Sequence, residues 1–156
     1  MRVVLLDGFQ DRDLPSTVLG FLSGLLANPA SPVTVFAEGQ DGLVRIVPGS
    51  PMELSQVLSA RPGQSRGLSW LSSEISSDLN ARGRDAVHVS VVTDGTGDPS
   101  GLRDASRLAE GGFSVFVLGE SGADRSAENF KEEASRVGQV FESTPMGFIP
   151  FVRKCL

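Results

Sequence analysis

Short, mainly apolar runs alternate along the chain with segments whose apolar residues recur every three or four positions. Val3 to Leu6, Val87 to Thr93 and Phe113 to Leu118 are rich in branched or aromatic residues and predict buried parallel strands. The segments from Leu14 to Leu25 and from Leu68 to Leu79 have the spacing of helices with one apolar face. This alternation predicts an α/β domain whose mostly parallel sheet is covered by helices on both faces.

Turn and capping signals predict the remaining elements. Val33–Phe36 and Leu43–Val47 are separated by the turn-rich residues 38–42 and should form an antiparallel hairpin. Further helices are expected at 51–60, over Ala127–Val137 and from Thr144 to the chain end, with a short strand at 139–142. Another helix should begin at Asp98 and Pro99, run through Ala109 and stop at Gly111 and Gly112. We therefore expect a doubly wound, Rossmann-like sheet of six strands with one antiparallel edge strand.

Two aspartates end the first and the central strand. In the doubly wound order these two strands are neighbours, so Asp7 and Asp94 should meet where open α/β sheets bind ligands. Converging carboxylates suggest a divalent cation, because hard cations take oxygen ligands. The alternative is that backbone donors or Arg66 hold each aspartate.

Composition narrows the possible functions. A chain of 156 residues is the size of one domain, and its net charge of -5 argues against binding a nucleic-acid backbone. No apolar run is long enough for a membrane span. The single cysteine, Cys155, is either free or half of a disulfide whose partner lies outside the chain.

Motifs for nucleotide binding and for serine hydrolysis are missing from the sequence. There is no phosphate loop, no Gly-x-Gly-x-x-Gly after the first strand and no Gly-x-Ser-x-Gly elbow. The one histidine, His88, lies in the central strand, where a packed and hydrogen-bonded side chain is expected rather than a base. An enzyme is not the favoured interpretation.

Four sequence features together resemble a von Willebrand factor type A domain, the module also found inserted in integrins. They are Leu6-Asp7-Gly8, the central Val91-Val92-Thr93-Asp94-Gly95, the helix-to-strand passage from Leu108 to Gly119, and the closing segment from Phe148 to Leu156. The resemblance spans nearly the whole chain. It implies a single domain over residues 1–156, excised from a longer, secreted multidomain protein.

The resemblance also implies a metal-ion-dependent adhesion site, built from an Asp-x-Ser-x-Ser loop, a threonine and the aspartate of Thr-Asp-Gly. Asp7 and Asp94 match that pattern, but the serine positions hold Phe9 and Asp11 and the threonine position falls at Gln64. Phenylalanine offers no oxygen, and the nearby Arg66 would oppose a cation. We expect a degenerate site without a cofactor; if Mg²⁺ or Mn²⁺ did bind, the candidate ligands would be Asp7, Asp11 and Asp94.

The expected function is that of a non-enzymatic adhesion module that binds a matrix or cell-surface protein without metal. An exposed aromatic residue in a loop, here Phe9, is a common anchor of protein interfaces. The residues predicted to contact the partner are Phe9, Gln10, Asp11, Gln64, Arg66 and Asp94. One alternative is a magnesium-dependent phosphotransfer enzyme of the haloacid-dehalogenase type, with an aspartate nucleophile after the first strand. Another is a structural spacer.

Overall fold

The computed structural model describes residues 2–8, 16–27, 33–47, 65–118 and 125–142. The strands in these ranges are β1 (Arg2–Asp7), β2 (Val33–Gly39), β3 (Gly42–Ile46), β4 (Ala86–Thr93), β5 (Ala109–Val117) and β6 (Gln139–Glu142). The helices are α1 (Ser16–Ala27), α3 (Gly67–Ala81), the short 3-10 helix η1 (Pro99–Gly101), α4 (Leu102–Arg107) and α5 (Arg125–Val137).

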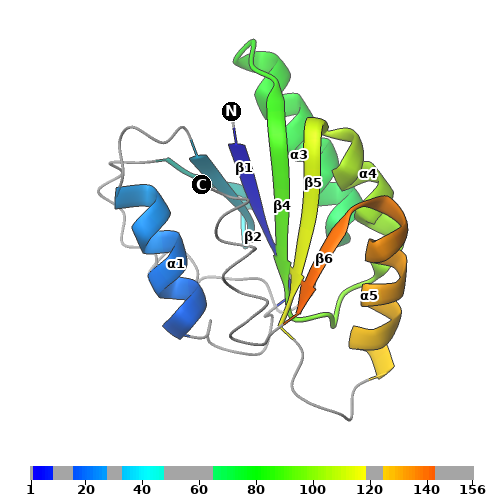
Figure 1. The fold of residues 1–156 in the computed structure, drawn as a ribbon. Coiled ribbons are helices and arrows are strands. Elements are labelled where there is room, and N and C mark those ends of the chain that lie inside the picture. The colour runs from blue at the N-terminus through cyan, green and yellow to red at the C-terminus, as the bar shows by residue number, and fades with distance from the viewer. Residues whose placement is uncertain (1, 9–15, 28–32, 48–64, 119–124, 143–156) are drawn as a thin grey trace.

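The strands form one sheet in the order β3-β2-β1-β4-β5-β6. All neighbouring pairs are parallel except β2 and β3, which form the antiparallel edge of the sheet. The predicted six-stranded, mostly parallel sheet with one antiparallel edge strand is thus confirmed. The carboxyl ends of β1, β4, β5 and β6 lie together at the lower edge of the sheet in Figure 1.

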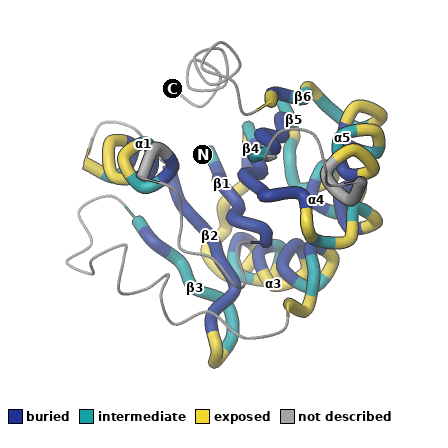
Figure 2. The backbone as a smooth tube through the Cα atoms, turned by 90° about the horizontal axis from the view of Figure 1, so that it is seen from below, coloured by how far each residue is buried: buried dark blue, intermediate teal, exposed yellow. Residues whose placement is uncertain are grey.

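The core has two parts, one on each face of the sheet. Because successive residues of a strand point to opposite faces, Val4 and Leu6 pack in the same cluster as α1, whereas Val3 and Leu5 pack with α3, α4 and α5. Figure 2 looks along the strands and shows the buried sheet between α1 and the other three helices. A central strand covered on both faces must be apolar throughout, which explains the run at Val3 to Leu6.

The helices on the second face follow the predicted spacing. In α3 the buried apolar residues are Leu68, Leu71, Ile75 and Leu79, and in α5 Phe130 and Ala134 are buried. Gly83 has φ of 61° just after α3, a left-handed conformation that glycine adopts without strain. Residues 82–85 are all exposed, as expected of a solvated turn.

The prediction that a helix runs through Ala109 to a stop at Gly111 and Gly112 is wrong. α4 ends at Arg107, and β5 already begins at Ala109, so both glycines lie within the strand. A Cβ at Gly111 would lie 2.6 Å from the carbonyl oxygen of Val87, and one at Gly112 would overlap the ring of His88. The glycines therefore permit β5 to approach β4 closely. The sequence pattern alone does not distinguish this role from helix termination.

The predicted hairpin is confirmed, but its turn is shorter than expected. β2 continues to Gly39, which pairs with Gly42, so only two residues connect the strands. Glu38, expected in the turn, is instead a buried strand residue with 5 % of its surface exposed. This correction matters because it places a third acidic side chain near the carboxyl edge of the sheet.

Two predicted helices, at 51–60 and from Thr144 to the chain end, lie outside the described residues, and so does Cys155. The predicted helix start at Asp98 and Pro99 is confirmed: η1 begins at Pro99, and Asp98 Oδ1 caps it by accepting a hydrogen bond of 2.9 Å from the amide of Ser100. Within the described ranges, no helix is long and apolar enough to cross a bilayer.

Candidate functional site

The ends of β1 and β4 bring the two predicted aspartates to one place. Asp7 is opposite Thr93 in the parallel register, and Asp94 follows directly. Only 5 % of Asp7 and 7 % of Asp94 are exposed. We call this region, Asp7, Gly8 and residues 93–98, the crest. The prediction that Asp7 and Asp94 lie at neighbouring strand ends is confirmed.

A chain of hydrogen bonds joins the crest residues. The amide of Gly95 donates to Thr93 Oγ1 over 3.0 Å, and the Thr93 hydroxyl donates to Asp7 Oδ2, also over 3.0 Å. Asp94 Oδ1 accepts from both the amide and the hydroxyl of Thr96, at 3.1 and 2.7 Å. Asp7 thus accepts a hydrogen bond from the last residue of β4, and Asp94 accepts two from the loop that follows it, so protein donors meet both buried carboxylates.

Two glycines allow the loops of the crest to interlock. Gly8 has φ of 81°, and a Cβ built there would overlap Asp94 Oδ1. On the opposite side, a Cβ at Gly97 would lie 2.9 Å from Asp7 Oδ2. Each carboxylate thus lies directly against a glycine of the other loop, and a side chain at either glycine would displace it.

Arg66 interacts with Glu38. The Glu38 carboxylate accepts two bonds from the Arg66 amide, at 3.0 and 3.2 Å, and one of 3.1 Å from the Ser65 hydroxyl. The Arg66 Nε lies 3.8 Å from Glu38 Oε1, and the guanidinium lies 4.7 Å from the centre of the Trp70 ring. Glu38 thereby satisfies an amide at the start of α3 and complements the positive end of its dipole.

The structure therefore does not support the alternative in which Arg66 holds Asp7 or Asp94. Arg66 ion-pairs with Glu38 at the end of β2. The donors described for the two aspartates are the Thr93 hydroxyl at the end of β4 and the amide and hydroxyl of Thr96 in the loop after it. Ser65 and Arg66 are tied to β2 through a residue that the sequence pattern had assigned to a turn. The sequence signal that could have revealed it is the pair Gly39 and Gly42 flanking a two-residue turn, which extends both strands of the hairpin.

Of the ligand positions that the type A resemblance implies, the described residues of the crest include only Asp7 and Asp94. Magnesium requires a near-octahedral shell of oxygens, yet Asp94 Oδ1 already accepts two hydrogen bonds from Thr96. In the part of the chain that the structure describes, no three histidine, cysteine or acidic side chains lie close enough together to hold an ion. Two carboxylates alone are a poor fit to such a site.

The predicted partner-binding residues are only partly described. Phe9, Gln10, Asp11 and Gln64 lie outside the described residues. Of the others, Asp94 is in the crest and Arg66 lies at the start of α3, with its side chain 47 % exposed. Thr96, which the sequence pattern did not single out, donates to Asp94 through both its amide and its hydroxyl.

His88 has the structural role predicted for it. Its Nε2 lies 3.2 Å from Ser114 Oγ, which lies 3.0 Å from Ser90 Oγ, and both serines are buried. These side chains connect β4 and β5 on the face that α1 also covers.

Comparison with known proteins adds no assignment, because no family model matches the chain and no curated protein matches it in sequence.

Proposed function

We propose that this domain is a non-enzymatic protein-binding module, similar to the von Willebrand factor type A domains of adhesion and matrix proteins. The observation that carries the proposal is the pairing of Asp7 with Thr93, which presents Asp94 beside Asp7 at the carboxyl edge of the sheet. The strand order β3-β2-β1-β4-β5-β6 supports a doubly wound sheet, in which the winding would reverse between β1 and β4. Ligands of such sheets bind at this reversal point, so we place the partner there.

The proposed binding is independent of metal. Hydroxyl and amide donors from Thr93 and Thr96 meet the carboxylates of the crest. Phenylalanine stands at one of the serine positions of the family pattern and glutamine at the threonine position. The partner is then held by direct contacts from Phe9, Gln10, Asp11, Gln64, Arg66 and Asp94 rather than through an ion.

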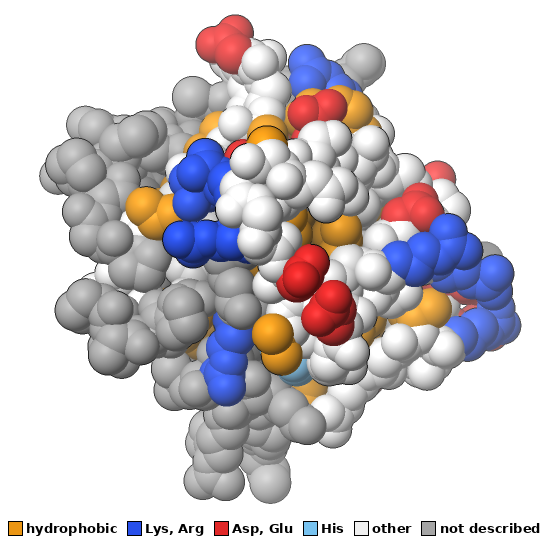
Figure 3. Space-filling view, turned by 90° about the horizontal axis from the view of Figure 1, so that it is seen from above, with side chains coloured by type: hydrophobic (Ala, Val, Ile, Leu, Met, Phe, Trp, Pro, Cys, Tyr) orange, Lys and Arg blue, Asp and Glu red, His pale blue; other side chains and the backbone are white. Residues whose placement is uncertain are grey.

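Charge favours a protein partner over a nucleic acid. The chain carries a net charge of -5, and basic and acidic side chains are interspersed on the face seen in Figure 3. A nucleic-acid surface needs a concentrated basic field. Following the family resemblance, the proposal places the domain outside the cell, as one module of a larger protein that binds a matrix or cell-surface partner.

Metal independence is tested by thermal unfolding in Mg²⁺ or Mn²⁺ and in EDTA. We expect the same Tm in all three solutions, because the crest carboxylates are satisfied by protein donors. Asp94→Asn is the matched variant, since it removes the charge and keeps the shape. A rise in Tm with metal that Asp94→Asn abolishes would contradict a metal-free site.

Partner binding is tested by surface plasmon resonance against a panel of purified matrix proteins, in EDTA. We expect Arg66→Ala to weaken binding, while its backbone amide still donates to Glu38 and the fold is kept. Ser77→Ala, at an exposed position of α3, is the control and should bind like the parent.

Binding to no member of the panel would favour the spacer alternative. Hydrolysis of p-nitrophenyl phosphate in Mg²⁺ would contradict a non-enzymatic module.

A further inference from the structure

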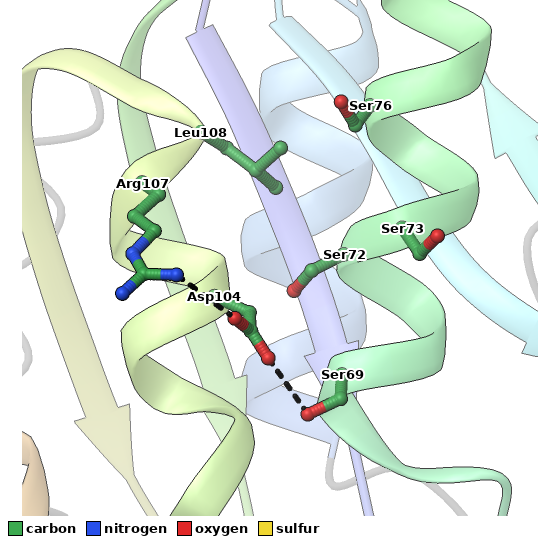
Figure 4. A pocket seen from close by; sticks show the side chains of 7 residues that line it. All are labelled: Ser69, Ser72, Ser73, Ser76, Asp104, Arg107 and Leu108. Atoms are coloured by element: carbon green, nitrogen blue, oxygen red, sulfur yellow. Dashed lines mark hydrogen bonds and ion pairs between the residues drawn. The ribbon is translucent and has the colours of Figure 1, made fainter.

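A hollow of about 350 Å³ opens between α3 and α4, on the helical face of the molecule and outside the crest. Four serines from one side of α3 form one wall, and the facing residues of α4 form the other (Figure 4). Its lining is Ser69, Ser72, Ser73, Ser76, Asp104, Arg107 and Leu108. We call it the serine hollow. Its volume lies at the lower end of the range of small-molecule sites, roughly 300–1,000 Å³.

The hollow follows from how the two helices approach each other. At the start of α4 they are close, since a Cβ at Gly101 would lie 2.6 Å from both Leu68 Cβ and the amide of Ser69. Further along α3, serines occupy positions three and four apart, which share one side of a helix. Their side chains are too short to fill the space toward α4, so a gap lined by hydroxyls remains.

Ser72 is the feature that points to a ligand. Only 3 % of this residue is exposed, and its Oγ is buried without a hydrogen-bond partner among the described residues. In Figure 4 the hydroxyl points from α3 toward α4, into the hollow. Buried hydroxyls in native proteins nearly always have a partner. A hydroxyl that lacks a partner and is directed at the hollow is a group that a bound molecule can satisfy.

The charges of the hollow define the kind of ligand. Asp104 Oδ2 accepts a hydrogen bond of 2.9 Å from Ser69 Oγ, and Asp104 Oδ1 lies 3.7 Å from Arg107 Nη1. The carboxylate and the guanidinium cancel, so the site carries no net charge and favours a neutral molecule. Serine hydroxyls both donate and accept, and they match ligand groups that do the same. Leu108 adds an apolar surface against which the C–H face of a ring can pack.

The geometry points to a binding site for a neutral, polyhydroxylated small molecule of the sugar class in the serine hollow. Ser72 supplies a hydroxyl from the α3 wall, Asp104 accepts from ligand hydroxyls, and Arg107 donates to them. Such ligands present donors and acceptors at every carbon, so one molecule can satisfy Ser72 and Asp104 together. This site is separate from the crest and does not depend on the function proposed for it.

The test is a titration of the ¹⁵N-labelled domain with D-glucose, D-galactose and D-mannose, followed by amide chemical shifts. We expect at least one sugar to produce saturable shifts confined to α3 and α4, with a dissociation constant on the order of millimolar, as is usual for a small ligand with few contacts. Glycine is the comparison ligand, because its ammonium and carboxylate would pair with Asp104 and Arg107 instead.

Three variants make the result specific. Ser72→Ala should weaken sugar binding about ten-fold, the effect of losing one hydrogen bond. Ser76→Leu should abolish binding by filling the hollow, and Ser77→Ala on the exposed side of α3 should leave it unchanged. The proposal is overturned if no sugar gives saturable shifts, if glycine binds and the sugars do not, or if Ser72→Ala binds sugar as well as the parent does.

Discussion

The crest and the serine hollow are both built from hydroxyls and carboxylates, yet they treat those groups differently. At the crest, the Thr93 hydroxyl accepts from one neighbour and donates to Asp7, so it is fully used inside the protein. In the hollow, the Ser72 hydroxyl is as deeply buried and has no partner among the described residues. Burial alone therefore does not distinguish a structural polar group from one that awaits a ligand.

The difference comes from the elements that carry the two sites. Paired strands have a fixed register, so Asp7 and Thr93 are held opposite each other by the ladder itself. Helices that pack side by side have no such ladder, and short side chains such as serine leave space between them. Deleting a hydroxyl should therefore have opposite effects in the two regions, and substituting a glycine should be costly where the crest loops interlock.

The largest effect is expected from Gly8→Ala at the crest. A left-handed φ and the overlap with Asp94 should together lower the free energy of unfolding by about 3 kcal/mol. Urea unfolding followed by circular dichroism measures the loss. The control is Gly20→Ala in α1, where a new Cβ meets nothing within 4 Å and should instead stabilise the helix by roughly 0.5–1 kcal/mol. Equal stabilities for the two variants would mean that the loops do not interlock.

A smaller loss is expected from Thr93→Val, which keeps the shape of the side chain and removes its hydroxyl. The change leaves the Gly95 amide and the Asp7 carboxylate each without one buried partner, and should cost about 2 kcal/mol. The same unfolding experiment applies, with Thr93→Ser as the variant that retains the hydroxyl. If the valine and serine variants are equally stable, the hydrogen bond to Asp7 contributes nothing.

The smallest effect, with the opposite sign, is expected from Ser72→Ala in the absence of any ligand. Removing a hydroxyl that has no partner should leave stability unchanged or raise it by up to about 1 kcal/mol. Alanine also favours the helix by about 0.5 kcal/mol, and Ser77→Ala measures that contribution alone. A Ser72→Ala protein that is less stable than Ser77→Ala would show that the hydroxyl has a partner inside the protein.

Much of the fold could be predicted from the sequence because its signals are periodic. The spacing of Leu68, Leu71, Ile75 and Leu79 predicts α3, and the apolar run at Val3 to Leu6 predicts a strand buried on both faces. The antiparallel hairpin and the adjacency of β1 and β4 follow from turn signals and from the rules for doubly wound sheets. These features depend on local pattern and on a small number of allowed topologies.

The parts that could not be predicted depend on close approach between distant segments. Gly111 and Gly112 look like a helix stop, but they serve β5 by making room for the backbone of Val87 and the ring of His88. Arg66 lies near Asp94 in the sequence-based picture, but its carboxylate partner is Glu38 on another strand. The orphan hydroxyl of Ser72 depends on the space between two helices, which no local pattern encodes.

The Thr93 to Asp7 hydrogen bond spans 86 positions of the chain and has a consequence for folding. β1 is made before β4 and cannot pair with it until the residues between them have emerged, and contacts of such long sequence separation form slowly. A growing or truncated chain can contain β1, α1 and the hairpin without any crest. The edge proposed to bind a partner therefore exists only in a chain that has completed its central sheet, so incomplete chains should not compete for the partner.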